Sequence, residues 1–204
     1  MTVWFTSDLH IGHEKVAEER ALGCMICPAE GEAAVEWHDN LLAHAWCSLV
    51  QHDDVVWVLG DISAGGNRSQ RRALDWLKQM PGKKHLIVGN HDGCHPMHRD
   101  SHKWQRIYLE AFESVQMAAR RHVPTTDGRV PVLLSHLPYS GDHTPAERLN
   151  EWRLRDEGLP VLHGHVHSVQ PETRSVNGSR QIDVGVDAWD LCPVSLEQIG
   201  EMLS

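Results

Sequence analysis

Five short polar motifs, each at the end of an apolar run, constrain this chain more than any other feature. They are Asp8-Leu9-His10, Gly60-Asp61, Gly89-Asn90-His91-Asp92, Ser135-His136 and Gly164-His165-Val166-His167. A short apolar run bounded by polar or turn residues is typical of a buried strand. We therefore expect a fold in which the functional side chains lie where strands end.

The hydrophobic pattern predicts an alternation of strands and helices. We expect strands at residues 3–6, 55–59, 85–88, 115–123, 130–135, 169–176 and 180–184, and helices at 33–50, 69–79 and 145–156. Turn signals at Thr126-Asp127-Gly128 and Asn177-Gly178 predict hairpins between the strands on either side. Residues 94–106 are polar and rich in histidine, which favours a loop near the site.

The length of 204 residues fits one domain, so we expect residues 1–204 to form a single domain. The chain has no apolar run that approaches the roughly 20 residues needed to cross a bilayer. It begins with a strand-like segment at Val3, with no basic region followed by an apolar stretch. We expect a cytoplasmic protein with no membrane partner, and the sequence carries no signal for an oligomeric state.

Cys24 and Cys27 form a C-x-x-C pair among five cysteines. A structural zinc site would need two further ligands at similar spacing, and a redox pair would need a thioredoxin-like βαβ setting. We therefore expect reduced, partly buried thiols, as is usual in the cytosol.

The formal net charge of −9 disfavours a nucleic-acid partner, because such binding depends on Lys and Arg replacing counterions. A local metal site can still attract a phosphate. The motifs supply four imidazoles, two carboxylates and an amide, which suit divalent ions of the Mn, Fe, Co, Ni and Zn group. The candidate ligands are Asp8, His10, Asp61, Asn90, His136, His165 and His167.

Two divalent ions would leave this donor set with a net positive charge, which suits a bridging hydroxide and a phosphate oxygen. The alternative is capping or loop hydrogen bonding by ordinary polar residues. The placement of seven such residues at strand ends argues against that alternative.

The order and spacing of the motifs resemble those of the calcineurin-like metallophosphoesterase superfamily. The runs at both ends of the chain are similar to its small bacterial and phage branch: Thr6-Ser7-Asp8-Leu9-His10-Ile11-Gly12-His13, and Val184-Gly185-Val186-Asp187-Ala188-Trp189 followed by Pro193-Val194-Ser195-Leu196. The resemblance implies an α/β (α+β) fold, a four-layered αββα sandwich of two mixed β-sheets flanked by helices.

The resemblance also implies a role for each motif residue. Asp8, His10 and His167 would hold one metal, Asn90, His136 and His165 would hold the other, and Asp61 would bridge them. Mn²⁺ is the first expectation for these ions, with Fe, Zn, Ni or Co as alternatives. His91 would contact the phosphate and protonate the leaving oxygen, because an imidazole titrates near neutral pH. Asp92 is expected to orient His91.

The implied activity is hydrolysis of a phosphodiester or phosphomonoester by direct attack of metal-bound hydroxide, without a covalent intermediate. We expect a small phosphorylated substrate, a nucleotide or cyclic nucleotide, because the chain is acidic and carries no added domain. Ile62-Ser63 stand where the protein Ser/Thr phosphatases of the superfamily have an acidic residue and an Arg, which disfavours a protein substrate.

Substrate contacts are expected from His13, Arg68 and Tyr139, against the alternatives of helix capping, a solvated helix face and core packing. Trp104 and Tyr139 are candidates for stacking on a nucleobase. One rival activity is a metal-dependent nuclease acting on DNA or RNA, which would need a local basic groove. The other rival is a non-catalytic interaction module on the same fold, which would have lost ligands.

Overall fold

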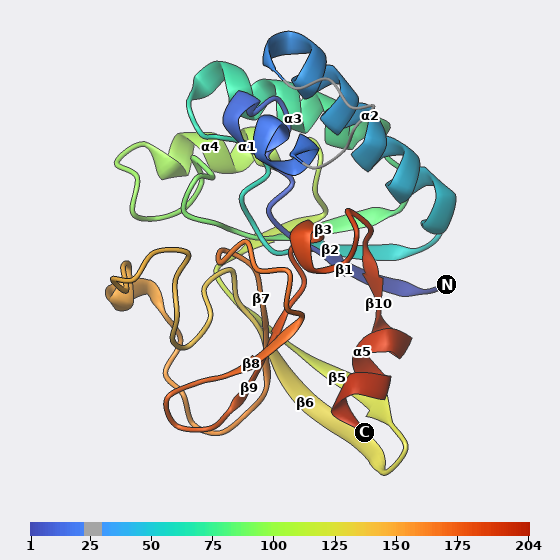
Figure 1. Ribbon diagram of the computed structural model, residues 1–204, viewed down its shortest axis with the longest axis vertical. Helices are drawn as coiled ribbons and strands as arrows, with labels where there is room; N and C mark the ends of the chain where they lie inside the picture. The colour runs from blue at the N-terminus through green and yellow to red at the C-terminus, as the bar shows by residue number, and fades with distance from the viewer. Residues whose placement is uncertain (23–29) are drawn as a thin grey trace.

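Two mixed β-sheets lie face to face in the computed structural model, which describes residues 1–22 and 30–204 (Figure 1). The first sheet has the order β10 (Val194–Ser195), β1 (Val3–Thr6), β2 (Val55–Val58), β3 (Lys83–Ile87), β4 (Ser114–Gln116). The second has the order β5 (Ala119–Thr125), β6 (Gly128–Leu134), β7 (Val161–His163), β9 (Arg180–Asp183), β8 (Glu172–Arg174). In the first sheet, β1 pairs with β2, β2 with β3 and β3 with β4, all in parallel. In the second sheet, β7 pairs in parallel with both β6 and β9. The predicted pair of mixed sheets is confirmed.

Helices cover the outer face of the first sheet (Figure 1). They are α1 (Glu14–Ala21), α2 (Gly31–Leu49), α3 (Asn67–Gln79) and α4 (Ser101–Tyr108). Trp46 of α2 and Leu74 of α3 pack with Val56 and Leu86 of the sheet in one buried cluster. Burying a large apolar side chain contributes about 1.5–3 kcal/mol, so this layer holds the first sheet and its connecting loops together.

A second apolar core fills the space between the two sheets. Phe5 and Ile87 of the first sheet meet Leu134 and Leu162 of the second, and all four are fully buried. Helix α5 (Leu196–Leu203) packs on β5 and β10 and adds Ile199 to this core. The sheets are therefore joined through their apolar faces, and the loops at their strand ends come close to one another.

The predicted strand at 115–123 is two strands in two different sheets. Its first part, β4, pairs with β3, and its second part, β5, pairs with β6. The chain changes sheets between Gln116 and Ala119, inside one apolar stretch that periodicity alone does not divide. The hairpins predicted at the two turns are confirmed, because β5 pairs with β6 and β8 with β9, both antiparallel.

The helix predicted at 145–156 is wrong, because this segment contains only a 3-10 turn at Asn150–Trp152. Leu149 has a left-handed backbone with φ 58°, which an α-helix cannot contain. The Asp142 carboxylate accepts hydrogen bonds from the backbone N–H and the guanidinium of Arg148, 3.1 and 2.9 Å long. These hydrogen bonds hold the segment in an irregular conformation that overrides its helical pattern.

The loop predicted at 94–106 is wrong in its second half, where α4 begins at Ser101. Tyr108 at the end of α4 is fully buried in the core below the helical layer. The expected thiol pair of Cys24 and Cys27 lies outside the described residues. Among the residues that the structure describes, no helix combines the length and the apolar character needed to cross a membrane.

Candidate metal centre

The seven predicted ligands follow strands of both sheets. Asp8 and His10 come after β1, Asp61 after β2 and Asn90 after β3, whereas His136 comes after β6 and His165 and His167 after β7. The structure brings these seven side chains together in two adjacent groups that each draw on both sheets. The sequence-based expectation that ligands lie at strand ends therefore describes their positions in the fold.

Asp8, His10 and His167 form the first group. The Nε2 atoms of His10 and His167 are 3.2 Å apart, and they lie 4.0 and 3.9 Å from Asp8 Oδ1. Asp8 Oδ1 is buried and has no hydrogen-bond partner among the described residues, an arrangement that is costly for a carboxylate left alone. Donors about 2.1 Å from one divalent ion lie roughly 3 Å apart at a right angle and up to about 4.2 Å apart when they face each other across the ion, so the three separations are compatible with one such ion.

Asp61, His136 and His165 form the second group, together with Asn90. His136 Nε2 lies 3.4 Å from Asp61 Oδ2 and 3.1 Å from Asn90 Oδ1. Burial disfavours the charge on Asp61, but the neighbouring imidazoles, His136 first, hold its pKa well below the usual range. Asp61 in turn raises the pKa of His136 to about 10 despite burial. A buried charged carboxylate beside converging imidazoles is what a cation site requires.

Hydrogen bonds at Nδ1 orient two of the imidazole rings so that Nε2 faces the donor groups. His136 Nδ1 is 2.6 Å from the Leu59 carbonyl oxygen, and His167 Nδ1 is 2.9 Å from Asp187 Oδ2. Because both partners are acceptors, Nδ1 of each ring donates its proton to them, and Nε2 is the nitrogen that faces the donor group and can bind a metal once it has lost its own proton. Burial lowers the pKa of His10 to about 3 and that of His165 to about 4, so these rings are neutral, as metal ligands must be.

Five of the seven ligands have a left-handed backbone, which is rare for residues with a side chain. Their φ angles are 57° for Asp8, 47° for His10, 52° for Asp61, 74° for His165 and 51° for His167. Each such residue costs of order 1–3 kcal/mol, and such strain is typical of functional sites. The chain therefore holds these side chains in place at the expense of local backbone energy.

Gly164 is needed because of a close approach between the two sheets. A Cβ atom at this position would collide with Ser7 Oγ and Asp8 Oδ2. His165, the next residue, donates its backbone N–H to the same Asp8 oxygen over 2.9 Å. The missing side chain thus lets the loop after β7 reach the loop after β1.

We expect Gly164→Ala to lower both the melting temperature and the metal affinity. Overpacking of this kind costs about 1–3 kcal/mol, and the collision falls on Asp8 itself. Differential scanning calorimetry and titration with Mn²⁺ would measure the two effects. In the matched variant Gly178→Ala, the new Cβ meets nothing within 4 Å but strains a turn with φ 89°, so only the melting temperature should fall. Equal metal affinities in the two variants would contradict this role of Gly164.

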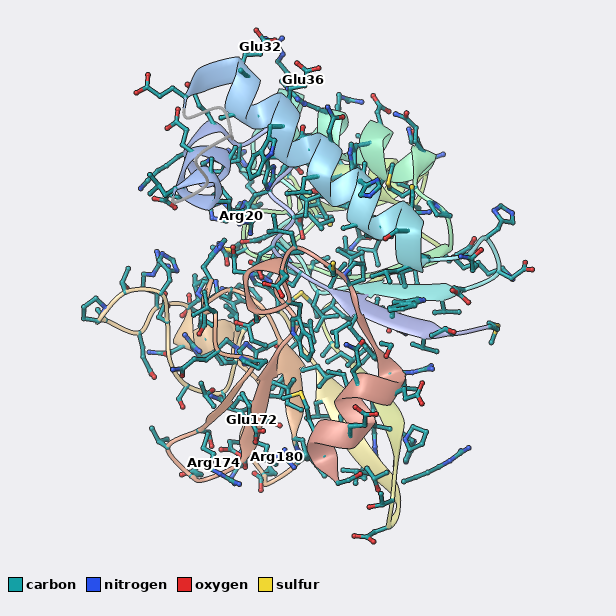
Figure 2. The ribbon with its side chains drawn as sticks, turned by 45° about the vertical axis from the view of Figure 1, so that its right-hand side comes forward. Arg20, Glu32, Glu36, Glu172, Arg174 and Arg180 are labelled. Atoms are coloured by element: carbon teal, nitrogen blue, oxygen red, sulfur yellow. The ribbon has the colours of Figure 1, made fainter. Side chains whose placement is uncertain are left out.

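Asp187 and Arg20 form hydrogen bonds that hold His167 and the backbone of Asp8 in the first group. Asp187 accepts the His167 Nδ1–H and two hydrogen bonds from the Arg20 guanidinium, 2.8 and 2.7 Å long. Arg20 also donates to the Asp8 carbonyl oxygen over 2.8 Å. Figure 2 shows Arg20 where α1 faces the loops of the second sheet. No sequence motif predicts a function for Arg20 or Asp187, although Asp187 lies inside the C-terminal run Val184–Trp189.

Asp142 and His143 form a further cluster with His165 that motif analysis missed. Asp142 Oδ2 lies 3.3 Å from His165 Nε2, and the His143 ring centre lies 5.5 Å from that of His165. Burial alone would raise the pKa of Asp142, but Arg148 and His165 hold it well below its usual range. No motif signalled these residues, because a loop with irregular backbone brings them to the centre.

His91 stands beside both groups and faces solvent. Its Nε2 lies 4.0 Å from Asp61 Oδ2, its ring centre lies 5.8 Å from that of His10, and its side chain is 47% exposed. Its backbone N–H donates to Asp61 Oδ1 over 2.8 Å. An imidazole in this position can reach a substrate held at the two groups.

The expected role of Asp92 beside His91 is corrected by the structure. The Asp92 carboxylate is fully buried and accepts backbone N–H groups of Gly89, Asp61 and Ile62 over 2.8, 3.1 and 3.2 Å. These bonds tie the loop after β2 to the loop after β3. Asp92 therefore fixes the backbone that carries Asp61 and Asn90, and none of its hydrogen bonds goes to the His91 side chain.

The three predicted substrate contacts have different positions. His13 caps α1, with Nδ1 accepting from the Val16 N–H over 3.5 Å, and its ring lies edge-on to His10. Arg68 lines a separate pocket between α2 and α3 that none of the predicted metal ligands lines. Tyr139 is buried, donates its hydroxyl to the Leu159 carbonyl over 3.0 Å, and has its pKa raised to about 12 by burial. Tyr139 therefore packs in the core, which corrects its predicted substrate contact. Arg68 is exposed on α3, and its substrate contact stays a prediction.

Comparison with known proteins gives consistent matches. The model of a family described as calcineurin-like phosphoesterase matches residues 1–169. The chain is 50% identical to the Gene 66 protein of Mycobacterium phage D29 over 204 residues, which covers 99% of this chain and 96% of the relative. It is 48% identical to the Gene 66 protein of Mycobacterium phage L5, covering 98% and 93%.

A solved structure, that of a protein of unknown function from Aquifex aeolicus, has a similar fold. It aligns with a TM-score of 0.63 at 21% sequence identity and covers 97% of each chain. At this identity the likeness concerns the fold alone.

Proposed function

Because the chain belongs to the calcineurin-like phosphoesterase family, we propose that it hydrolyses a phosphate ester of a nucleotide or cyclic nucleotide at a centre for two divalent cations. The family makes the chain a metal-dependent phosphoesterase. The observation that carries the finer proposal is the convergence of two adjacent donor groups, one around Asp8 and one around Asp61, each completed by histidines of the opposite sheet.

The charge of the centre favours an anionic substrate. Asp8 and Asp61 supply two carboxylates, so two divalent cations would leave a net positive charge for a phosphate. When bound, such cations lower the pKa of a water molecule and hold the attacking and leaving oxygens in line at phosphorus. The mixed imidazole, carboxylate and amide donors suit Mn²⁺ first, with Fe, Zn, Ni and Co as alternatives.

The side chains of this protein orient the metal ligands and supply the proton for the leaving group. Asp187 and Leu59 fix the rings of His167 and His136 through their Nδ1–H groups. Asp92 fixes the loops that carry Asp61 and Asn90. We assign protonation of the leaving oxygen to His91, which is half exposed and lies beside both groups. Such general acid catalysis contributes about 10²–10⁴-fold.

The two rival functions have less support. A non-catalytic interaction module would have lost ligands, and all seven predicted ligands are present. A nuclease would need a basic surface, whereas the chain has a formal net charge of −9. A steep loss of activity with rising salt on a DNA or RNA substrate would favour the nuclease over the nucleotide hydrolase.

We expect chelator-treated protein to be inactive on bis-p-nitrophenyl phosphate and p-nitrophenyl phosphate, and Mn²⁺ to restore activity on at least one of them. His91→Ala should lower kcat by about 100-fold while calorimetric titration shows unchanged Mn²⁺ binding. The control is His122→Ala, an exposed imidazole on β5, which should match the wild type. If the metal-loaded wild type were inert on both esters, general phosphoesterase activity toward small substrates would be excluded.

A further inference from the structure

A pocket with a volume of about 370 Å³ opens beside His91, on the side of the helical layer. The loop before α3 and the segment that leads into α4 form its walls, with Asn67, Asp100 and Trp104 among the lining residues. None of these three residues has a role in the metal centre described above. A cavity of this size lies within the range that small organic ligands occupy.

Two residues that lie in or beside the metal centre also line this pocket. His91 lines it and places Nε2 4.0 Å from Asp61 Oδ2. Asn90 also lines it and places its Oδ1 3.1 Å from His136 Nε2. A phosphate held between the donor groups, with its leaving oxygen at His91, would therefore direct the leaving alcohol into this pocket.

We propose that this leaving-group pocket binds the nucleoside part of the substrate, with the base against Trp104. The inference rests on the proposed function and adds to it the side of the phosphate on which the nucleoside lies. It assigns to Trp104 the selection of a nucleotide over a phosphate ester that has no base.

The surroundings of Trp104 hold its ring in a fixed orientation. The ring lies edge-on to Tyr108, with ring centres 6.2 Å apart, and the Arg71 guanidinium lies 5.5 Å from the ring centre. The Tyr108 hydroxyl donates to Gln70 Oε1 over 2.8 Å, which anchors this part of the wall. Stacking on a preordered aromatic ring suits any nucleobase, because every base has a π face.

Polar groups accompany the aromatic ring, as a nucleoside requires. Asn67 is exposed at the start of α3, and Asp100 precedes α4 with its carboxylate 2.6 Å from Lys103 Nζ. His98 Nε2 lies 2.8 Å from the Asn90 carbonyl oxygen and fixes the wall next to His91. An amide and a carboxylate can accept hydrogen bonds from the amino groups of a base or from a ribose hydroxyl.

The test compares two inhibitors that share a phosphate and a ribose but differ in the base. Inhibition constants for AMP and ribose 5-phosphate are measured against hydrolysis of bis-p-nitrophenyl phosphate by the Mn²⁺-loaded protein. In the wild type, AMP should bind about tenfold more tightly than ribose 5-phosphate, as expected for one stacked base. Trp104→Leu should bring the two constants within about twofold, and Trp104→Phe, which keeps an aromatic ring, should preserve most of the difference.

The control is Trp76→Leu, because Trp76 lies on α3 and lines a different pocket; it should keep the wild-type ratio. Equal constants in the wild type, or an undiminished ratio in Trp104→Leu, would overturn the proposal even though the enzyme is active. Absence of hydrolysis by the metal-loaded wild type would instead contradict the proposed function. If Trp104→Leu does not fold, the ratio of the two inhibition constants in the wild type still shows whether the base is bound. The smaller ring of Trp104→Phe stacks less strongly, so this variant should lower the ratio measurably if Trp104 contacts the base.

Discussion

Asp61→Asn should lower metal-dependent hydrolysis of bis-p-nitrophenyl phosphate by roughly 10³-fold or more, which is about 4 kcal/mol of transition-state stabilisation. The substitution preserves the size of the side chain and removes its charge. Asp61 is one of the two carboxylates of the centre, and it lies 3.4 Å from His136 Nε2 and 4.0 Å from His91 Nε2. Loss of this charge weakens the attraction for a cation and misaligns the groups that face the substrate.

The measurement is kcat at saturating Mn²⁺, together with the metal content of the purified variant. Asp75→Asn is the matched control, because Asp75 lies on α3 with a side chain that is 70% exposed, and it should behave as the wild type. If the Asp61→Asn protein keeps its metal and its kcat lies within tenfold of the wild-type value, Asp61 is not a metal ligand.

Arg20→Met should lower the free energy of unfolding by about 3–5 kcal/mol, because it leaves the largely enclosed Asp187 carboxylate without its guanidinium partner. The Arg20 side chain is 6% exposed and that of Asp187 is 16% exposed. The variant would also leave the Asp8 carbonyl oxygen without the Arg20 donor. For a chain of this size the melting temperature should fall by roughly 6–20 °C, which a thermal melt in chelator would measure free of metal effects.

Arg180→Met is the matched control for this prediction. Arg180 makes a similar two-point contact with Glu172, at 2.7 and 2.9 Å, but the side chains are 25% and 31% exposed. Figure 2 shows this pair on the second sheet, away from Arg20. A more solvated pair is worth about 0–1 kcal/mol, so this variant should melt within a few degrees of the wild type. Equal losses in the two variants would contradict the larger contribution of the less exposed pair at Arg20.

The sequence was sufficient to predict the parts of the fold and the site that depend on local patterns. Short apolar runs predicted β1, β2 and β3, and the turn signals predicted both hairpins. The polar residues that follow β1, β2, β3, β6 and β7 could be read from the sequence for the same reason, and the structure gathers them in one place.

Tertiary contacts explain where prediction from the sequence was wrong. The segment 145–156 has a helical pattern but forms only a 3-10 turn, because Asp142 forms ion pairs with Arg148 and Arg153 that hold it in an irregular conformation. Asp92 is next to His91 in the sequence, but the backbone turns its carboxylate toward buried N–H groups. Asp187 could not be assigned, because its partner His167 is twenty residues away and only the fold brings the two together.

The origin of the donor groups in both sheets has a consequence for the kinetics of folding. Asp8 and His10 follow a strand of the first sheet and His167 follows one of the second, and Asp61 and His136 are divided in the same way. A chain in which only one sheet has formed therefore offers neither complete group to a cation. A divalent ion that binds only the native state stabilises it by mass action, and contacts that are absent from the folding transition state slow unfolding without accelerating folding. A divalent cation bound at this centre should therefore slow unfolding and prolong the lifetime of the native state.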